Sequence, residues 1–429
     1  MHIRQWGTVS RICPQSIEIA GIDHVASIGD EICVWAAERP VIGEVLEVRA
    51  GIANAYLFSD ASELRIGDKS WLRGRPSISP GDHWLGQIVS FDGRVLDEAI
   101  ADFGSRDARP LHASPPEAKK RRDMGERLSS GLMVTDTLLP ICRGQRVGLF
   151  AGSGVGKSTL LAQFARGVRA DRVVIGLIGE RSREVGRFAN EVLPQEVRDK
   201  AVIVAATSSE PPGAKKRAAY TAMATAEHFR DQGHDVLLLF DSLTRFVEAH
   251  REIALESGET PALNAFPPSS VRVVAELVER AGPGMSGQGD ITAVFSVLVA
   301  GSDMEEPVAD MVRGVLDGHI VLSRAIAERG RFPAIDVLRS VSRSLPEAAS
   351  DAEIEIIAKA RHCITLFEEV LPMLRAGLYE YGKDEQSDWA IECFPAIDEF
   401  LAMPNIAKLE HAFTSLAERL SSPSAQPQD

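Results

Sequence analysis

The 429-residue sequence predicts an α/β protein with an N-terminal β-barrel, a central domain on a mostly parallel sheet, and a C-terminal α-helical domain. Residues 1–75 contain short strand-like runs separated by Gly and Asp at regular intervals, as in small barrels. From 145 to about 345, runs rich in Val, Ile and Leu alternate with helix-like segments, which is typical of strands buried on both faces of a parallel sheet. After Pro346 the strand signal fades, and 350–421 has helical periodicity.

These changes in pattern divide the chain into five segments. We expect the barrel at 1–75, a Gly/Pro-rich connector at 76–140, the central domain at 141–346, the helical domain at 347–421 and a disordered tail at 422–429. The expected barrel strands are GTVSRI, SIEIAG, EICVWAA, VIGEVLEVRA, ANAYLFS and KSWLRG. The expected central strands are QRVGLF, RVVIGLIG, AVIVAAT, DVLLLFD and ITAVFSVLVAG.

Composition argues against a nucleic-acid-binding or metal-cluster protein. The net charge of −14 is poorly suited to a phosphate backbone, and the basic cluster KKRR at 119–122 lies in an expected exposed linker, where solvated side chains are favoured. The five cysteines never form C-x-x-C and the ten histidines have no metal-ligand spacing, so we expect reduced thiols in a cytoplasmic protein. We expect no nucleic-acid partner.

The chain also lacks sequence signals for the membrane. No window reaches the ~18 apolar residues that a membrane span needs. Residues 1–15 contain no apolar core of signal-peptide length. We therefore expect no direct membrane span, and any work at a membrane would be done from the cytoplasmic side through partners.

The stretch VGLFAGSGVGKSTLLAQF at 147–164 carries the strongest chemical signal. A plain strand-to-helix turn would need one or two glycines and would have no use for a lysine. A phosphate cradle explains the whole pattern, because small residues let backbone N–H groups wrap around phosphates. Lys157 would then reach the β/γ oxygens and Ser158 would offer its hydroxyl to Mg²⁺ at the start of a helix.

One position departs from the strict phosphate-loop pattern, because Ala151 stands where the first glycine is expected. Alanine is still small, so we keep the assignment and expect a central P-loop NTPase domain. The expected nucleotide-binding residues of the loop are Ala151, Gly152, Ser153, Gly154, Val155, Gly156, Lys157, Ser158 and Thr159.

Two further strands end in carboxylates. DVLLLFDSLTRF at 235–246 places Asp241 at the carboxyl end of a strand, where it could hold Mg²⁺, although an Asp there is also a common helix cap. VVIGLIGERSREVGRF at 173–188 has Glu180 as its first polar residue, where a carboxylate could orient the water that attacks the γ-phosphate. Arg181 would link Glu180 to neighbouring groups. A surface salt bridge is the plain alternative for the ERSRE segment.

The stretch RFPAIDVLRSVSR at 331–343 adds an arginine far along the chain from the loop. Phosphoryl transfer builds charge on the γ-phosphate oxygens, and an arginine from outside the loop can neutralise it. Arg343 could serve the site of a neighbouring subunit, but spacing alone does not establish this.

With AGSGVGKST, GLIGERSREV, FDSLTRF, VLDGHIVLSR and FPAIDVLRSVSR in this order, the chain resembles the hexameric α/β family of rotary ATPases. Within that family it looks like the type III secretion export ATPases, in particular the flagellum-specific ones. The resemblance covers nearly the whole chain. It implies a catalytic set of Lys157, Glu180, Arg181, Asp241 and Arg343, with Mg²⁺ held by Ser158 and Asp241. It also implies that Arg343 acts across the subunit interface and that Phe332 stacks on adenine.

The resemblance implies a Mg²⁺-dependent ATP hydrolase that forms a homohexameric ring and energises protein export through a flagellar type III secretion apparatus. The implied location is the cytoplasmic face of the inner membrane. The implied partners are further copies of the chain, a stator-like regulator, a central stalk protein, the membrane export gate, and export substrates with their chaperones. Secretion members usually carry an N-terminal helical extension that docks the regulator, whereas here the barrel is expected to begin within the first ten residues.

Other functions remain open. An ATPase of a virulence-type injectisome shares all these motifs, and a rotary ATP synthase catalytic subunit shares most of them. An RNA-translocating hexamer shares the nucleotide-binding core, but the acidic balance and the lack of an aromatic and basic platform argue against it. A catalytically inactive scaffold is disfavoured because Lys157, Glu180, Asp241 and Arg343 are all present.

Overall fold

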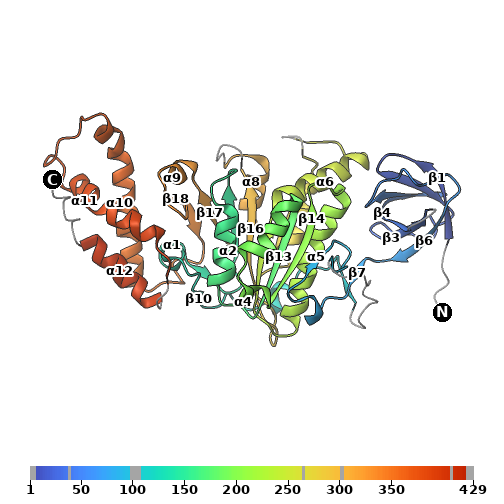
Figure 1. The fold of residues 1–429 in the computed structure, drawn as a ribbon, viewed down its shortest axis with the longest axis horizontal. Helices are drawn as coiled ribbons and strands as arrows, with labels where there is room; N and C mark the ends of the chain where they lie inside the picture. Colours follow the sequence, from blue (N-terminus) through green and yellow to red (C-terminus); the bar gives the residue numbers. More distant parts are fainter. Residues whose placement is uncertain are drawn as a thin grey trace.

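The computed structural model describes residues 6–36, 40–96, 108–262, 266–299, 304–405 and 409–421. Its three parts lie in a row, with the barrel at one end, the central sheet in the middle and the C-terminal helices at the other end (Figure 1). The tail expected at 422–429 lies outside the described residues.

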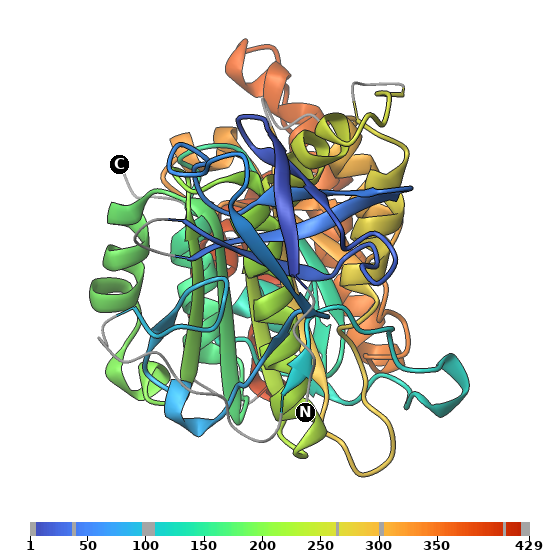
Figure 2. The same ribbon diagram turned by 90° about the vertical axis from the view of Figure 1, so that its right-hand side faces the viewer.

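The N-terminal part is a closed six-stranded antiparallel barrel in the order β1-β2-β5-β4-β3-β6. All six strands expected from the sequence are present, and in Figure 2 the barrel lies in front of the central sheet. Alternate residues such as Ile17, Ile19 and Val34 fill its interior, as the period of two requires. The strands are β1 (Trp6–Ile12), β2 (Ser16–Ala20), β3 (Glu31–Trp35), β4 (Pro40–Arg49), β5 (Ile52–Leu57) and β6 (Lys69–Gly74).

The central domain is built on an eight-stranded sheet in the order β18-β17-β12-β16-β15-β13-β14-β8. Neighbouring strands are parallel except for the pair β17 and β18, so the expected mostly parallel sheet is confirmed. The strands are β8 (Ile88–Val89), β12 (Arg146–Ala151), β13 (Arg172–Glu180), β14 (Ala201–Thr207), β15 (Val236–Asp241), β16 (Ile291–Leu298), β17 (Gly318–Leu322) and β18 (Ile335–Ser342).

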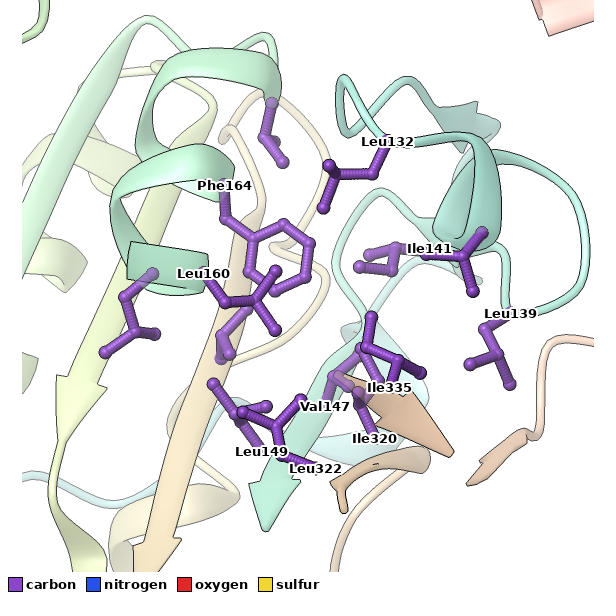
Figure 3. Packing of buried hydrophobic residues seen from close by; sticks show 14 of the residues in the cluster. Leu132, Leu139, Ile141, Val147, Leu149, Leu160, Phe164, Ile320, Leu322 and Ile335 are labelled. Atoms are coloured by element: carbon purple, nitrogen blue, oxygen red, sulfur yellow. The ribbon is translucent and has the colours of Figure 1, made fainter. Parts of the chain in front are cut away.

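Helices cover both faces of this sheet. Successive residues of β12 point to opposite faces, so that Leu149 and Phe150 belong to two different hydrophobic clusters. On one face, Leu160 and Phe164 of α2 point toward Leu149, as Figure 3 shows. The helices are α2 (Lys157–Gly167), α3 (Ser182–Arg187), α4 (Gln195–Arg198), α5 (Pro212–Asp231), α6 (Leu243–Glu256), α7 (Ser269–Val278), α8 (Pro307–Arg313) and α9 (Arg324–Glu328), with a π-helical turn at Phe188–Val192.

The connector between barrel and sheet contains short elements. They are β7 (Ser77–Ile78), β9 (Arg109–Pro110), β10 (Arg127–Leu128), α1 (Met133–Asp136), β11 (Ile141–Cys142) and 3₁₀ turns at Asp82–Trp84 and Ala118–Lys120.

The prediction of a solvated KKRR cluster is wrong for Arg121, which is largely buried, whereas Arg122 is exposed but forms an ion pair. The Arg121 guanidinium donates to the carbonyl oxygens of Glu279 and Ala281 beyond the end of α7, and Arg122 forms an ion pair with Asp290 at 2.6 Å. Both arginines therefore fasten the connector to the central domain. The physical reason is that carbonyl groups at the end of a helix need donors.

The C-terminal part contains α10 (Asp351–Arg375), α11 (Glu385–Ala402) and α12 (Leu409–Ser421), which confirms the expected helical domain. A capping box between Ser350 and Glu353 begins α10. Phe367 of α10 and Phe394 of α11 stack with their ring centroids 3.6 Å apart. Within the described ranges, no helix has both the length and the hydropathy needed to cross a membrane.

Candidate active site

The phosphate loop joins β12 to α2, and its backbone conformation explains two of its glycines. Gly154 has a φ of 77° and Gly156, just before α2, has a φ of 96°, which is the left-handed region that favours glycine. Ala151 is the last residue of β12 and pairs with Leu298 of β16. An extended residue inside a strand does not require glycine, so the departure from the strict pattern leaves the loop intact.

The side chains of the loop divide between the core and the solvent. Val155 is buried in the hydrophobic cluster under the loop, whereas Ser153, Ser158 and Thr159 are exposed. Because α2 begins at Lys157, the free N–H groups of its first turn and the Ser158 hydroxyl lie at the same end of the helix. This is the geometry expected of an anion site.

A lysine from the start of α2 and two carboxylates from strand ends meet beside the loop. The Lys157 Nζ lies 2.5 Å from Oδ1 of Asp241 and 3.5 Å from Oε1 of Glu180. Asp241 ends β15 and Glu180 ends β13, so both carboxylates lie at the carboxyl edge of the parallel sheet. The structure thus brings together Lys157, Glu180 and Asp241, the residues that the sequence singled out.

These side chains are largely removed from water. The exposed fractions of the side chains are 12% for Lys157, 5% for Asp241 and 21% for Glu180. Asp241 has a second partner, because the Ser296 hydroxyl donates to its Oδ1 at 2.5 Å. The carboxylate of Asp241 is therefore held in a fixed position by one charged and one neutral donor.

The acidity of Glu180 differs from that of an ordinary glutamate. Burial and, to a lesser extent, the negative charge of Asp241 raise the pKa of Glu180 to about 7, against the opposing effect of Lys157. A carboxyl group with a pKa near neutrality can accept a proton from water more readily than an ordinary carboxylate. Glu180 is therefore placed and tuned as a candidate general base.

A cavity of about 1230 Å³ opens over the loop. It is lined by the phosphate loop, by Glu180 and Arg181, and by residues of α3 and α6. The volume is sufficient for a nucleoside triphosphate, since small-molecule sites are usually about 300–1,000 Å³.

Two predicted residues lie away from the cluster of charges. Arg181 is exposed and forms an ion pair with Glu184 at 3.4 Å. Arg343 follows β18 at the edge of the sheet, where its guanidinium donates to the carbonyl of Leu316 at 3.0 Å. Arg343 is not one of the described residues that line the cavity.

Phe332 lies against the phosphate loop. Its Cδ1 atom is 3.5 Å from the position that a β-carbon on Gly156 would occupy. The residue is 52% exposed, so part of its ring is open to solvent beside the loop. A planar ligand could therefore cover its free face.

Sequence reasoning missed three groups of this site. Ser296 is one of two hydroxyl residues in the otherwise apolar strand β16, and that irregularity was its only signal. Thr244 of α6 accepts a hydrogen bond from the backbone N–H of Leu298 at 2.8 Å and lines the cavity. Arg245 packs on Gly179, whose φ of 74° and missing side chain let the arginine approach the end of β13.

Comparison with known proteins gives the family. The nucleotide-binding domain of the ATP synthase alpha/beta family matches residues 131–342, and the T3SS EscN ATPase C-terminal domain matches residues 349–417. The flagellum-specific ATP synthase of Caulobacter vibrioides is 39% identical, with 97% of this chain and 96% of the relative covered. The chain belongs to the type III secretion ATPases of the ATP synthase α/β family.

Other members of this ATPase family are similar in sequence to the chain over most of its length. The flagellum-specific ATP synthase of Treponema pallidum is 41% identical over 99% of this chain and 95% of the relative. The SPI-2 type 3 secretion system ATPase of Salmonella typhimurium is 42% identical over 87% of this chain and 85% of the relative. As a member of this family, the chain is an ATP hydrolase.

A solved structure of the family has the same fold. The assembled ATPase EscN from the enteropathogenic E. coli type III secretion system superposes with a TM-score of 0.88 at 35% identity, covering 96% of this chain and 100% of the solved EscN chain. EscN has also been solved in complex with its central stalk EscO. The resemblance drawn from the motifs and the predicted fold class are both confirmed.

Proposed function

We propose that this type III secretion ATPase hydrolyses ATP at the phosphate loop, with Lys157, Glu180 and Asp241 as its central groups. The proposal rests on the contacts of Lys157 with two carboxylates beside the loop. Its Nζ lies 2.5 Å from Oδ1 of Asp241 and 3.5 Å from Oε1 of Glu180. A phosphate-binding loop alone binds nucleotide. A carboxylate poised next to it adds the means to activate water.

Each residue has a distinct role in the proposal. Lys157 and the N–H groups at the start of α2 bind the β- and γ-phosphates. Glu180 orients the attacking water and accepts its proton at a carboxylate oxygen. Ser158 and Asp241 supply the hard oxygen ligands that Mg²⁺ prefers, and the fixed position of Asp241 between Lys157 and Ser296 suits that task. When bound, Mg²⁺ would neutralise charge on the phosphate oxygens.

Two residues complete the proposal. Phe332 stacks on adenine, supported by its exposed ring beside Gly156. Arg343 neutralises the developing charge in the site of a neighbouring copy, supported by its position at the sheet edge away from its own cavity. Arg181 acts at the rim of the cavity, where it reaches Glu184.

We further propose that the chain forms a homohexameric ring that energises protein export through a flagellar type III secretion apparatus. The full-length similarity to flagellum-specific ATP synthases supports this. The proposed location is the cytoplasmic face of the inner membrane. The proposed partners are a central stalk protein, by analogy with EscN and EscO, a stator-like regulator, the membrane export gate, and substrates with their chaperones.

A second candidate is the ATPase of an injectisome, because the SPI-2 relative is 42% identical and EscN has the same fold. Complementation separates the two. The gene is expected to restore swimming to a bacterium that lacks its flagellum-specific ATPase, and not to restore effector secretion to one that lacks its injectisome ATPase. The opposite pattern would reverse the assignment.

The experiment that tests the hydrolysis itself is Lys157→Ala. Wild-type protein is expected to hydrolyse ATP in the presence of Mg²⁺, and the variant to lose this activity while its circular dichroism spectrum stays unchanged. Lys157 is the side-chain cation at the loop, so its loss removes the contact with the transferred phosphate. Normal turnover by a folded Lys157→Ala protein would refute the proposed site.

A further inference from the structure

We infer that Asp398, on helix α11 of the C-terminal domain, is a positioning residue for the adenine side of the nucleotide site. It acts through the guanidinium of Arg331 on the adjacent Phe332. The inference rests on the proposed stacking of Phe332 on adenine and deepens it, because it makes base recognition depend on a helix of another part of the molecule.

The first observation is the ion pair that joins the two parts. The Nε of Arg331 lies 3.0 Å from Oδ1 of Asp398. Arg331 lies in the short turn between α9 and β18, whereas Asp398 lies near the end of α11. The contact therefore links the segment that carries Phe332 to the helical domain.

The second observation is that the Arg331 guanidinium also donates hydrogen bonds within its own turn. Its NH2 group donates to the carbonyl oxygen of Ile335 at 2.8 Å, and its NH1 group donates to that of Pro333 at 3.4 Å. The turn thus folds back over the guanidinium of Arg331. The carbonyl of Pro333 directly follows Phe332 and that of Ile335 lies three residues beyond it, so the guanidinium holds the backbone that leaves Phe332.

The third observation is burial. Arg331 is only 8% exposed, and Asp398 is the carboxylate in contact with it within the described chain. Loss of the carboxylate in contact destabilises the buried guanidinium even though Asp336 and Glu368 also act on its charge, so we expect it to shift toward solvent. Phe332 would then lose the support that holds its ring beside Gly156.

The geometry separates this role from that of an ordinary surface ion pair. Phe332 is half exposed, so packing against the loop encloses only part of its side chain. Its orientation must therefore come from the backbone on either side, which Arg331 holds. Asp398 touches no part of the cavity, so any effect on nucleotide has to pass through this turn.

The test compares two ligands that differ in the base. Binding of a non-hydrolysable ATP analogue and of inorganic tripolyphosphate is measured by calorimetry for the wild type, Phe332→Ala, Asp398→Asn and the double variant. Glu399→Gln, which removes the neighbouring charge on the exposed side of α11, is the matched control. Asp398→Glu, which keeps the charge, should recover most of the wild-type affinity.

Loss of an aromatic stacking contact should weaken binding of the analogue by about 5- to 150-fold in Phe332→Ala. Asp398→Asn should also weaken binding of the analogue, by a smaller factor than Phe332→Ala. In both variants the affinity for tripolyphosphate should stay unchanged. The double variant should bind the analogue no more weakly than Phe332→Ala alone, because two residues that act through one contact are not additive.

The possible results separate the inference from the proposed function. If Phe332→Ala leaves the affinity for the analogue unchanged, the base does not stack there, and both ideas fall. If Phe332→Ala weakens it but Asp398→Asn behaves like Glu399→Gln, only the positioning role is wrong. The positioning role would also be overturned if Asp398→Asn weakened the binding of both ligands equally. Additive losses of affinity in the double variant would overturn it as well.

Discussion

At the scale of single residues, Glu180 is the group whose chemistry depends most on its surroundings. Replacing it with glutamine keeps the shape and the hydrogen-bonding capacity but removes the negative charge. We expect Glu180→Gln to bind ATP with nearly unchanged affinity and to hydrolyse it about 10²–10⁴ times more slowly, the usual contribution of a positioned base. Nucleotide binding by calorimetry and phosphate release measure the two effects. Joint loss of binding and turnover would mean that Glu180 is structural.

The raised pKa of Glu180 also predicts a pH dependence. Water activation needs the carboxylate form, which in the free enzyme is lost as the pH falls below about 7. We therefore expect kcat/KM for ATP to fall on the acidic side with a midpoint near pH 7, not near the usual glutamate value. ATP itself titrates in this range, so the residual activity of Glu180→Gln serves as the reference. If that variant shows the same acidic fall, the titrating group is not Glu180.

The residues found from the sequence share one property. Glu180 and Asp241 each end an apolar run, and Lys157 follows the loop after another such run, so their side chains had to reach the carboxyl edge of the sheet. Ser296 lies inside its strand, and its role depends on β15 and β16 being neighbours. The order of strands in a sheet is set by the tertiary structure, so no local sequence pattern predicts it.

At the scale of elements, α2 depends on a glycine at its end as well as at its beginning. A β-carbon on Gly167 would lie 1.9 Å from the carbonyl oxygen of Ser130, so the helix can approach the connector only without a side chain there. We expect Gly167→Ala to destabilise the protein by about 1–3 kcal/mol, the usual cost of overpacking, and to lower its melting temperature.

A matched glycine provides the control for α2. Gly186 lies within α3, and a β-carbon there would meet nothing within 4 Å. Gly186→Ala should stabilise the protein by about 0.5–1 kcal/mol, because alanine loses less backbone freedom in a helix. The two variants are compared by thermal unfolding without nucleotide. Equal melting temperatures would show that the close contact at Gly167 relaxes without cost.

The elements themselves were predictable to different degrees. Continuous apolar runs identified five strands of the central sheet, because strands buried on both faces leave no other pattern. Strand β18 alternates between buried and more exposed residues, as an antiparallel edge strand should, but its motif drew attention only to Phe332 before it and Arg343 after it. Strand β8 has two residues, too few for any periodicity. The role of Arg121 depended on carbonyl groups more than 150 residues away.

At the scale of the whole molecule, the central question is how one chain completes its own active site. The cavity contains Lys157 and Glu180, whereas Arg343 lies at the sheet edge and bonds to the carbonyl of Leu316. We expect Arg343→Ala to bind ATP and to hydrolyse it about 10³–10⁵ times more slowly, as for other arginine fingers. Total activity of the wild type should rise more steeply than linearly with protein concentration, so that its specific activity increases. Full activity at dilutions where only monomer is seen would falsify action between copies.

Mixing two inactive variants provides the direct test of this arrangement. Arg343→Ala lacks the arginine and Lys157→Ala lacks the phosphate contact, so each ring alone is expected to be inactive. A mixed ring contains some interfaces where an intact loop faces an intact arginine. Partial recovery of ATP hydrolysis on mixing is the expected result. Mixtures that stay inactive, although mixed rings form, would argue against it.

The ion pair between Lys157 and Asp241 has one further consequence for the resting molecule. Lys157 is not a free cation but is already matched by a carboxylate, so an entering anion must replace that carboxylate. A singly charged anion would merely exchange one negative charge for another. A triphosphate instead offers several charges at once to the lysine and to the N–H groups of the loop. The resting pair therefore predicts that the loop prefers polyphosphates to singly charged anions at equal concentration.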